Sequence, residues 1–187
     1  MADRPILFSA PMVRALLAGR KTQTRRLAAS PLRRVEVGDR LYVREACAIE
    51  KAGYFVPRNV QGRIHYRADG VPRPPEPTAT GLRTGRWRPS IHMPRCASRL
   101  TLIVEGVKVE PLQAISLADL RAEGLHQKNG SQLWWATDDV AAFEPDACFG
   151  TLWNALHAKP GELWEDNPHV VALTFRVEQR NIDQVGA

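Results

Sequence analysis

The sequence lacks long hydrophobic runs and has few cysteines. No stretch reaches the roughly 18 uninterrupted apolar residues of a membrane helix, and residues 1–5 lack the basic and then apolar layout of a signal peptide. These absences predict a cytoplasmic protein with no membrane contact. The three cysteines, Cys47, Cys96 and Cys148, are odd in number and unrelated in spacing, so reduced thiols are expected rather than a disulfide framework.

Sequence signatures of metal and phosphate chemistry are missing too. His92 and Cys96 have a spacing that could suit a metal, but no second pair at ligand spacing accompanies them, so no metal is expected. The zinc deaminase pattern, the phosphate-cradling glycine motifs and the Gly-x-Ser-x-Gly elbow are all absent. The sequence therefore predicts no cofactor.

What is present is a globular composition with an uneven charge. The 187 residues are 44% hydrophobic and 25% charged, which predicts one folded domain over residues 1–187. Residues 1–100 carry 20 basic and 7 acidic side chains, whereas residues 101–187 carry 6 and 13. The basic half suits a phosphate or nucleic-acid partner. Alternatively, the 21 arginines against 5 lysines reflect GC-rich codons and lie on solvent.

Hydrophobic spacing predicts an α+β chain. Helices are expected over 9–19, 116–123 and 147–156, and strands over 40–46, 63–67, 99–112 and 169–177. Ser116 and Asp119 have the spacing of a capping box. Because parallel βαβ units are too few for a doubly wound sheet, we expect a small mixed β-barrel with helices packed on it. Residues from about 50–90 and 128–145 are predicted loop insertions, and the first is a candidate lid or partner-contacting arm.

Glu45 stands out on the expected strand over residues 40–46. Alternation places it on the same face as the apolar Leu41 and Val43. It either turns to solvent at the strand end or is buried beside an arginine, since an unpaired buried charge would be costly.

Two motifs resemble a known family. Residues 19–26 read Gly-Arg-Lys-Thr-Gln-Thr-Arg-Arg, and residues 38–45 read Gly-Asp-Arg-Leu-Tyr-Val-Arg-Glu. With residues 87–95 and the closing aromatic helix and strand, they resemble the phage and prophage branch of the ASCH domain, which is similar to the PUA domain. The resemblance spans the chain apart from the two insertions, and it implies a β-barrel fold and RNA or nucleoside chemistry.

The resemblance also implies an activity. Small bacterial ASCH proteins include N4-acetylcytidine amidohydrolases, whose lysine, threonine and glutamate correspond to Lys21, Thr24 and Glu123. We therefore expect an amidohydrolase that removes the acyl group from N4-acylated cytosine nucleosides or bases. Chemically, Thr24 can attack the amide, Lys21 can accept its proton, and Glu123 can orient Lys21 or shuttle protons.

This mechanism makes two demands on Lys21. Its ordinary pKa of about 10.4 must be lowered by burial or by the flanking arginines before it can act as a base. Residues three apart share a face of a helical turn but lie on opposite faces of a strand. Lys21 and Thr24 can therefore cooperate only if the chain turns or coils after Gly19.

Other residues are candidates for binding the substrate. Arg26, Glu45 and His92 could hold the base or ribose, with Tyr42 or Trp87 as stacking surfaces. Two other functions fit the same basic segment: a non-catalytic module that binds RNA or a modified base, and a ribonuclease. In the absence of the family resemblance, Thr24 would be an ordinary strand hydroxyl and Lys21 a solvated cation.

Overall fold

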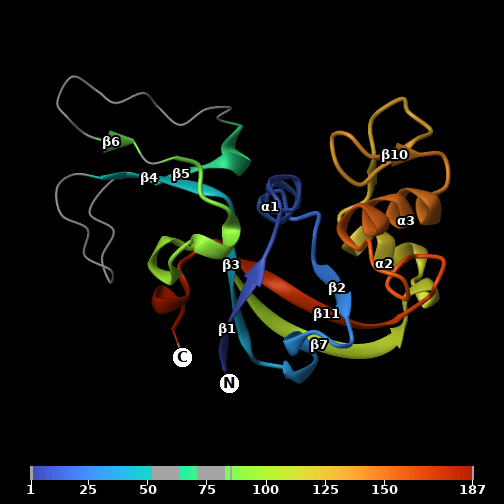
Figure 1. Ribbon diagram of the computed structural model, residues 1–187, viewed down its shortest axis with the longest axis horizontal. Helices are drawn as coiled ribbons and strands as arrows, with labels where there is room; N and C mark the ends of the chain where they lie inside the picture. The colour runs from blue at the N-terminus through green and yellow to red at the C-terminus, as the bar shows by residue number, and fades with distance from the viewer. Residues whose placement is uncertain (1, 52–63, 71–82, 85, 187) are drawn as a thin grey trace. The chain divides into compact units, whose positions relative to one another are not determined.

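The computed structural model describes residues 2–51, 64–70, 83–84 and 86–186, and the chain forms two compact units (Figure 1). The first unit comprises residues 15–39 and 103–176. The second comprises residues 2–14, 40–102 and 177–187. Within the described ranges, no helix is long and apolar enough to cross a membrane.

The main sheet is mixed and five-stranded, with the strand order β1-β3-β7-β11-β2. Its strands are β1 (Asp3–Leu7), β2 (Gln23–Leu27), β3 (Arg40–Arg44), β7 (Thr101–Pro111) and β11 (His169–Glu178). β1 runs parallel to β3, and β2 runs antiparallel to β11. The predicted α+β class is confirmed. A closed barrel would require the two edge strands to pair, and the described residues instead form an open sheet with β1 and β2 at its edges.

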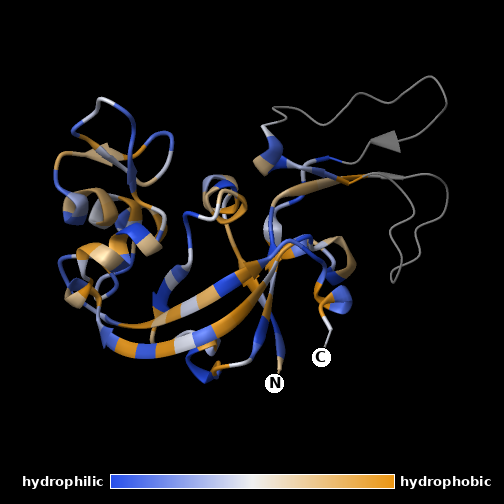
Figure 2. Cartoon of the chain, turned by 180° about the vertical axis from the view of Figure 1, so that it is seen from behind, coloured by the Kyte–Doolittle hydropathy of each residue, from blue (hydrophilic) through white to orange (hydrophobic). Residues whose placement is uncertain are grey.

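Burial explains why β7 and β11 were recognisable as strands. β11 runs from residue 170 to 173 without an exposed side chain, as expected for a central strand. β7 begins with four buried residues, and hydrophobic and hydrophilic residues alternate through its second half (Figure 2). In that half Val109 is 55% exposed while Glu110 is only 5% exposed, so the apolar residue faces solvent and the carboxylate is buried.

The helices of the first unit pack on each other beside a shared core. They are α2 (Leu117–Ala122) and α3 (Pro145–Leu156) (Figure 1). α2 lies within its predicted region, whereas α3 begins at Pro145, before the predicted start at residue 147. Ser116 and Asp119 form the predicted capping box at the start of α2. This core contains buried residues of both helices and of the neighbouring strands and loops: Leu112, Ile115, Leu120, Leu125, Cys148, Phe149, Trp153 and Val170.

A small antiparallel sheet begins just before the second predicted insertion and continues through it. Its strands are β8 (His126–Gln127), β9 (Trp134–Trp135) and β10 (Ala141–Ala142), with β9 in the centre. Residues 128–145 were expected to form a loop. Two-residue strands are too short to show an alternating hydrophobic pattern, which is why the sequence did not indicate them.

The second unit contains another three-stranded sheet. Its strands are β4 (Cys47–Lys51), β5 (Ile64–Tyr66) and β6 (Arg83–Thr84), with β4 in the centre. Cys47, Ile49, Met93 and Ala97 form its core. In its described part, the first predicted insertion contains β5 and β6. Residues 52–63, 71–82 and 85 of the candidate lid lie outside the described residues.

Candidate active site

The segment that carries the motif turns before it becomes a strand. Helix α1 (Ala10–Leu17) ends as predicted, and Gly19 follows with φ of +69°. The backbone N–H groups of Arg20 and Lys21 both donate to the carbonyl of Ala15, at 2.9 and 3.1 Å. β2 starts only at residue 23. The chain therefore turns between Gly19 and Lys21, as the proposed chemistry requires, and is extended where Thr24 lies.

Two backbone hydrogen bonds fix this segment against distant parts of the first unit. The N–H of Thr22 donates to the carbonyl of Ala122 at the end of α2, at 2.8 Å. The carbonyl of Thr22 accepts from the N–H of Phe175 on β11, at 2.9 Å. The end of α2 is thereby placed beside Lys21.

Lys21 and Glu123 form a buried ion pair. Lys21 Nζ lies 2.6 Å from Glu123 Oε2 and donates to the Glu123 carbonyl oxygen at 2.9 Å. The two side chains are 2% and 6% exposed. The structure thus brings together two of the three residues expected to carry the reaction, from positions 102 residues apart.

The surroundings of Lys21 shift its acidity. Burial lowers the pKa of Lys21 below the ordinary value of 10.5, because the ammonium loses its hydration. The carboxylate of Glu123 opposes this shift, and the cationic charges of Arg26 and Arg25 add to it. The net direction is downward, which favours a lysine that gives up its proton more readily than one in water.

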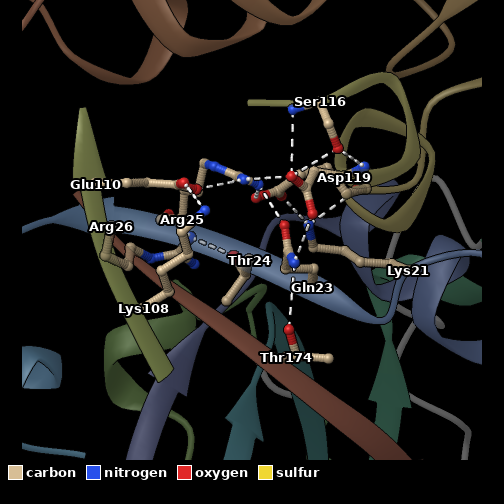
Figure 3. A network of polar contacts seen from close by, with 11 residues as sticks. Lys21, Gln23, Thr24, Arg25, Arg26, Lys108, Glu110, Ser116, Asp119 and Thr174 are labelled. Atoms are coloured by element: carbon tan, nitrogen blue, oxygen red, sulfur yellow. Dashed lines mark hydrogen bonds and ion pairs between the residues drawn. The ribbon is translucent and has the colours of Figure 1, made fainter. Parts of the chain in front are cut away.

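Arg25 contacts several carboxylates at once (Figure 3). Its guanidinium donates to Glu110 Oε1 at 2.8 Å and lies 3.3 Å from both Glu123 Oε1 and Asp119 Oδ2. The arginine is 2% exposed. Because Lys21 contacts Oε2 of Glu123 and Arg25 contacts Oε1, the carboxylate is fixed from both sides.

Gln23 joins this network to the rest of the first unit. Its Nε2 donates to Asp119 Oδ1 at 3.0 Å and to Thr174 Oγ1 at 3.2 Å (Figure 3). Burial alone would raise the pKa of Asp119, but hydrogen bonds from Ser116 and Gln23 and the charge of Arg25 lower it overall. Asp119 therefore serves as an ionised acceptor that links α2, β2 and β11.

Thr24 lies on the opposite face of β2 from Arg25. Neighbouring residues of a strand point to opposite faces, so residues two apart share a face and can form hydrogen bonds with each other. Arg25 donates to Gln23 Oε1, whereas Arg26 Nη1 donates to Thr24 Oγ1 at 2.7 Å. Thr24 is 1% exposed. Its hydrogen bond is thus with Arg26, while Lys21 bonds to Glu123.

These two pairs are close enough to interact electrostatically. The charge of Arg26 lowers the pKa of Lys21, and the charge of Glu123 opposes the lowering that burial causes in the pKa of Arg26. All four residues belong to the first unit. The arrangement offers a hydroxyl, a buried lysine of lowered pKa, a carboxylate and a guanidinium.

Comparisons with protein-family models, with curated proteins and with solved structures find no match to this chain.

The remaining predicted binding residues have different surroundings. Arg26 is half-buried and also donates to the carbonyl of Arg25. Glu45 and His92 belong to the second unit. Glu45 is buried and accepts from Arg99 at 2.8 and 3.2 Å, which confirms the paired interpretation, and burial raises its pKa. His92 is exposed at the end of a short 3₁₀ helix.

The candidate stacking residues and the possible metal ligands also have defined places in the second unit. Tyr42 has the guanidinium of Arg95 over its ring, at 5.5 Å from the centroid. Trp87 is half-buried. Cys96 is a free thiol, like Cys47 and Cys148. Among the described residues, no group of three or more His, Cys, Asp or Glu side chains could hold a metal ion.

The sequence did not identify Arg25, Glu110 and Asp119 as parts of one site. In the sequence, Arg25 is one of the arginines that flank Lys21, and Asp119 is part of a helix cap. Glu110 left one signal, because alternation along β7 places it on the face opposite Val109. The partner of a buried carboxylate is set by tertiary packing, so the strand pattern alone could not name Arg25.

Proposed function

We propose that the protein is an amidohydrolase that removes the acyl group from N4-acylated cytosine nucleosides or bases. The main support is the buried contact of 2.6 Å between Lys21 and Glu123. The resemblance to PUA-like ASCH amidohydrolases points to these two residues, which lie in distant parts of the sequence. Their contact, on a segment that also carries Thr24, supplies the groups that amide hydrolysis needs.

The proposed reaction begins with Thr24. Its hydroxyl oxygen attacks the acyl carbonyl carbon while neutral Lys21 takes the hydroxyl proton. Arg26, which already donates to Thr24 Oγ1, stabilises the negative charge that develops on the carbonyl oxygen. The C–N bond then breaks, Lys21 returns the proton to the leaving amine, and the acyl group remains as an ester on Thr24.

Water completes the cycle. Lys21 accepts a proton from the water that attacks the ester, and the carboxylic acid leaves as the Thr24 hydroxyl is restored. Glu123 orients the lysine through its 2.6 Å contact and stabilises the ammonium between the two steps. Because Lys21 and Thr24 are each 1% exposed, the acyl group reaches them only when neighbouring side chains move aside.

The charge balance around Lys21 and Arg25 favours this proposal over a role for these two residues in RNA binding. Phosphate contacts need cations that face solvent and lack tight acidic partners. Lys21 is engaged by Glu123, and Arg25 by Glu110, Asp119 and Glu123. Both cations are buried. They are therefore suited to adjusting protonation inside the protein rather than to neutralising a nucleic acid backbone.

The test is release of cytidine from N4-acetylcytidine, followed by chromatography. We expect turnover by the wild-type protein and a loss of at least about 100-fold in Lys21→Met, Thr24→Val and Glu123→Gln, since each removes a reacting or orienting group. Thr24→Ser keeps the hydroxyl and should retain activity. Arg33→Met, at an exposed position of the same unit, is the matched control.

Two results would contradict the proposal. Full activity in all three variants would rule out these residues as the site. No turnover by the wild-type protein, together with RNA binding that weakens steeply with salt, would favour a binding module.

A further inference from the structure

The small sheet formed by β8, β9 and β10 has two different faces. His126 lies directly opposite Trp135, and Gln127 lies opposite Trp134. Directly opposed residues of antiparallel strands project to the same face. Trp134 packs against the hydrophobic core of α2 and α3. His126 and Trp135 therefore share the other face, away from that core.

Positively charged side chains gather on this second face. Lys128 places its Nζ 3.5 Å from the centroid of the Trp135 ring. Arg20 Nη1 lies 2.8 Å from His126 Nδ1 and donates to the carbonyl oxygen of Gly124 at 3.2 Å. Arg20 and Lys128 are exposed, and His126 and Trp135 are half-buried. We call these four residues, Arg20, His126, Lys128 and Trp135, the basic aromatic face.

His126 serves this face as a neutral hydrogen-bond acceptor. Burial lowers its pKa, and the charges of Arg20 and Lys128 lower it further, while backbone hydrogen bonds oppose the shift. Its Nδ1 therefore accepts from Arg20 and fixes the direction of the guanidinium. The other charged groups of the insertion are Asp138 and Asp139, in the bend that follows β9, and Glu144, directly before α3.

The basic aromatic face directly borders the ion pair of the candidate site. Arg20 is the residue before Lys21, and the carbonyl that it contacts belongs to the residue after Glu123. A ligand on this face would thus lie next to the proposed reacting groups.

Trp135 offers a ring face for stacking and a hydrogen-bond donor that a ligand could use. A cation on one face of an indole ring occupies the position that a stacked base would take. The indole Nε1 is buried, and it has no hydrogen-bond partner among the residues that the structure describes. Buried donors usually find an acceptor, so this group is suited to an acceptor that a ligand provides.

We propose that the basic aromatic face binds a phosphate-bearing cytosine nucleotide, with the base stacked on Trp135 and the phosphate contacted by Arg20 and Lys128. Lys128 leaves the ring as the base arrives and turns to the phosphate. The proposal rests on the proposed function for the choice of cytosine as the base and for the delivery of the acyl group to Thr24. The binding itself requires neither an acyl group nor hydrolysis, so it can be tested separately.

The experiment is a calorimetric titration of the full-length protein at low salt with cytidine and with cytidine 5′-monophosphate. We expect the monophosphate to bind about tenfold more tightly, and Lys128→Ala and Arg20→Gln each to remove most of that difference. Lys159 is another exposed lysine of the same unit, and Lys159→Ala should keep the difference in affinity between the two ligands. Trp135→Ala should weaken the binding of both ligands. Trp135→Phe keeps an aromatic ring and should retain binding, but the quenching of Trp135 fluorescence by the bound ligand should disappear.

The nucleotide could be free or part of a polymer, and a second titration separates these sources. A short cytidine oligonucleotide without a 5′-phosphate should bind as well as the monophosphate if RNA supplies the phosphate, and more weakly if the free nucleotide does. Equal affinity for cytidine and its monophosphate would overturn the proposal. If Lys128→Ala and Lys159→Ala reduced the preference for the monophosphate equally, the proposal would also be overturned. The preference would then depend on the net charge of the protein and not on the position of Lys128. Failure of acyl hydrolysis would leave these titrations unaffected.

Discussion

Lys21 and Glu123 form an ion pair of 2.6 Å that is almost completely buried, and Arg25 contacts the other oxygen of the same carboxylate at 3.3 Å. The pair is therefore unsymmetrical. Removing the lysine leaves a carboxylate that still has a cationic partner. Removing the carboxylate leaves a buried ammonium near two arginines.

This asymmetry predicts unequal losses of stability. Glu123→Gln should lower the free energy of unfolding by about 3–5 kcal/mol, because Lys21 loses its counter-charge inside the protein. Lys21→Met should lower it by only about 1–2 kcal/mol, since Arg25 still neutralises Glu123. Urea denaturation at pH 7 measures both values. Equal losses, or a larger loss in Lys21→Met, would show that Arg25 does not compensate Glu123.

The lowered pKa of Lys21 predicts how stability changes with pH. The folded protein releases the Lys21 proton at lower pH than the unfolded chain, whose lysine keeps the ordinary value of 10.5. Between these two pKa values the unfolded state binds more protons, so this residue's contribution to stability rises with pH. The free energy of unfolding of the wild type, minus that of Lys21→Met, should therefore increase as pH rises toward 10.5. A difference that stays constant would mean that the pKa is not lowered.

Arg25 should act on catalysis through Lys21 and Glu123. Its charge lowers the pKa of Lys21, so Arg25→Met should move the rising limb of the pH–rate profile to higher pH. Arg25→Lys keeps the charge but not the planar fork, so kcat should fall by about tenfold with little change in the profile. The control Arg33→Met should alter neither kcat nor the pH–rate profile. A purely structural role for Arg25 would lower activity in both variants without moving the profile.

Gly124 predicts a further effect on the site. Its φ is +108°, and an added Cβ would lie 3.3 Å from the Cβ of Ala15 and 3.5 Å from that of Lys21. Gly124→Ala should therefore cost about 2–3 kcal/mol of stability, because the backbone is strained at this φ and the new Cβ crowds Ala15. It should also lower kcat/KM, because the carbonyl of Ala15 accepts from the N–H of Lys21 and Ala15 must shift. Gly130 has φ of +76° and open space around it, so Gly130→Ala should cost about 1 kcal/mol and leave kcat/KM unchanged. Equal effects of the two substitutions on stability and turnover would argue against the close packing of Gly124 on Ala15 beside Lys21.

Local patterns predicted the elements that frame the site. The turn at Gly19 and the capping box of Ser116 and Asp119 were expected and are present, because both depend on residues within a few positions of one another. The contact of Lys21 with Glu123 followed only from the family resemblance, since no periodicity relates residues so far apart. Burial of Glu45 beside an arginine was one of two open interpretations, and the structure selects it by placing Arg99 there.

Other features depend on tertiary packing that the sequence does not encode locally. The sheet is open and not the expected barrel. A barrel closes only if its two edge strands pair, and the alternation of hydrophobic residues along each strand is the same in an open sheet and in a closed barrel. The small sheet of the second insertion has strands of two residues, below the length at which alternation is visible. The contacts of Arg25 with Glu110 and Asp119 join β2, β7 and α2, so only the folded chain specifies them.

The cap of α2 has a consequence for how the site is maintained. α2 has six residues, too few for an isolated helix to persist in water. Asp119, which completes its cap, also accepts from Gln23 and lies 3.3 Å from Arg25, and both of these residues are on the strand that follows Lys21. The helix that ends just before Glu123 and the strand that follows Lys21 therefore form a single cooperative unit. A local opening of either one separates the carboxylate of Glu123 from Lys21.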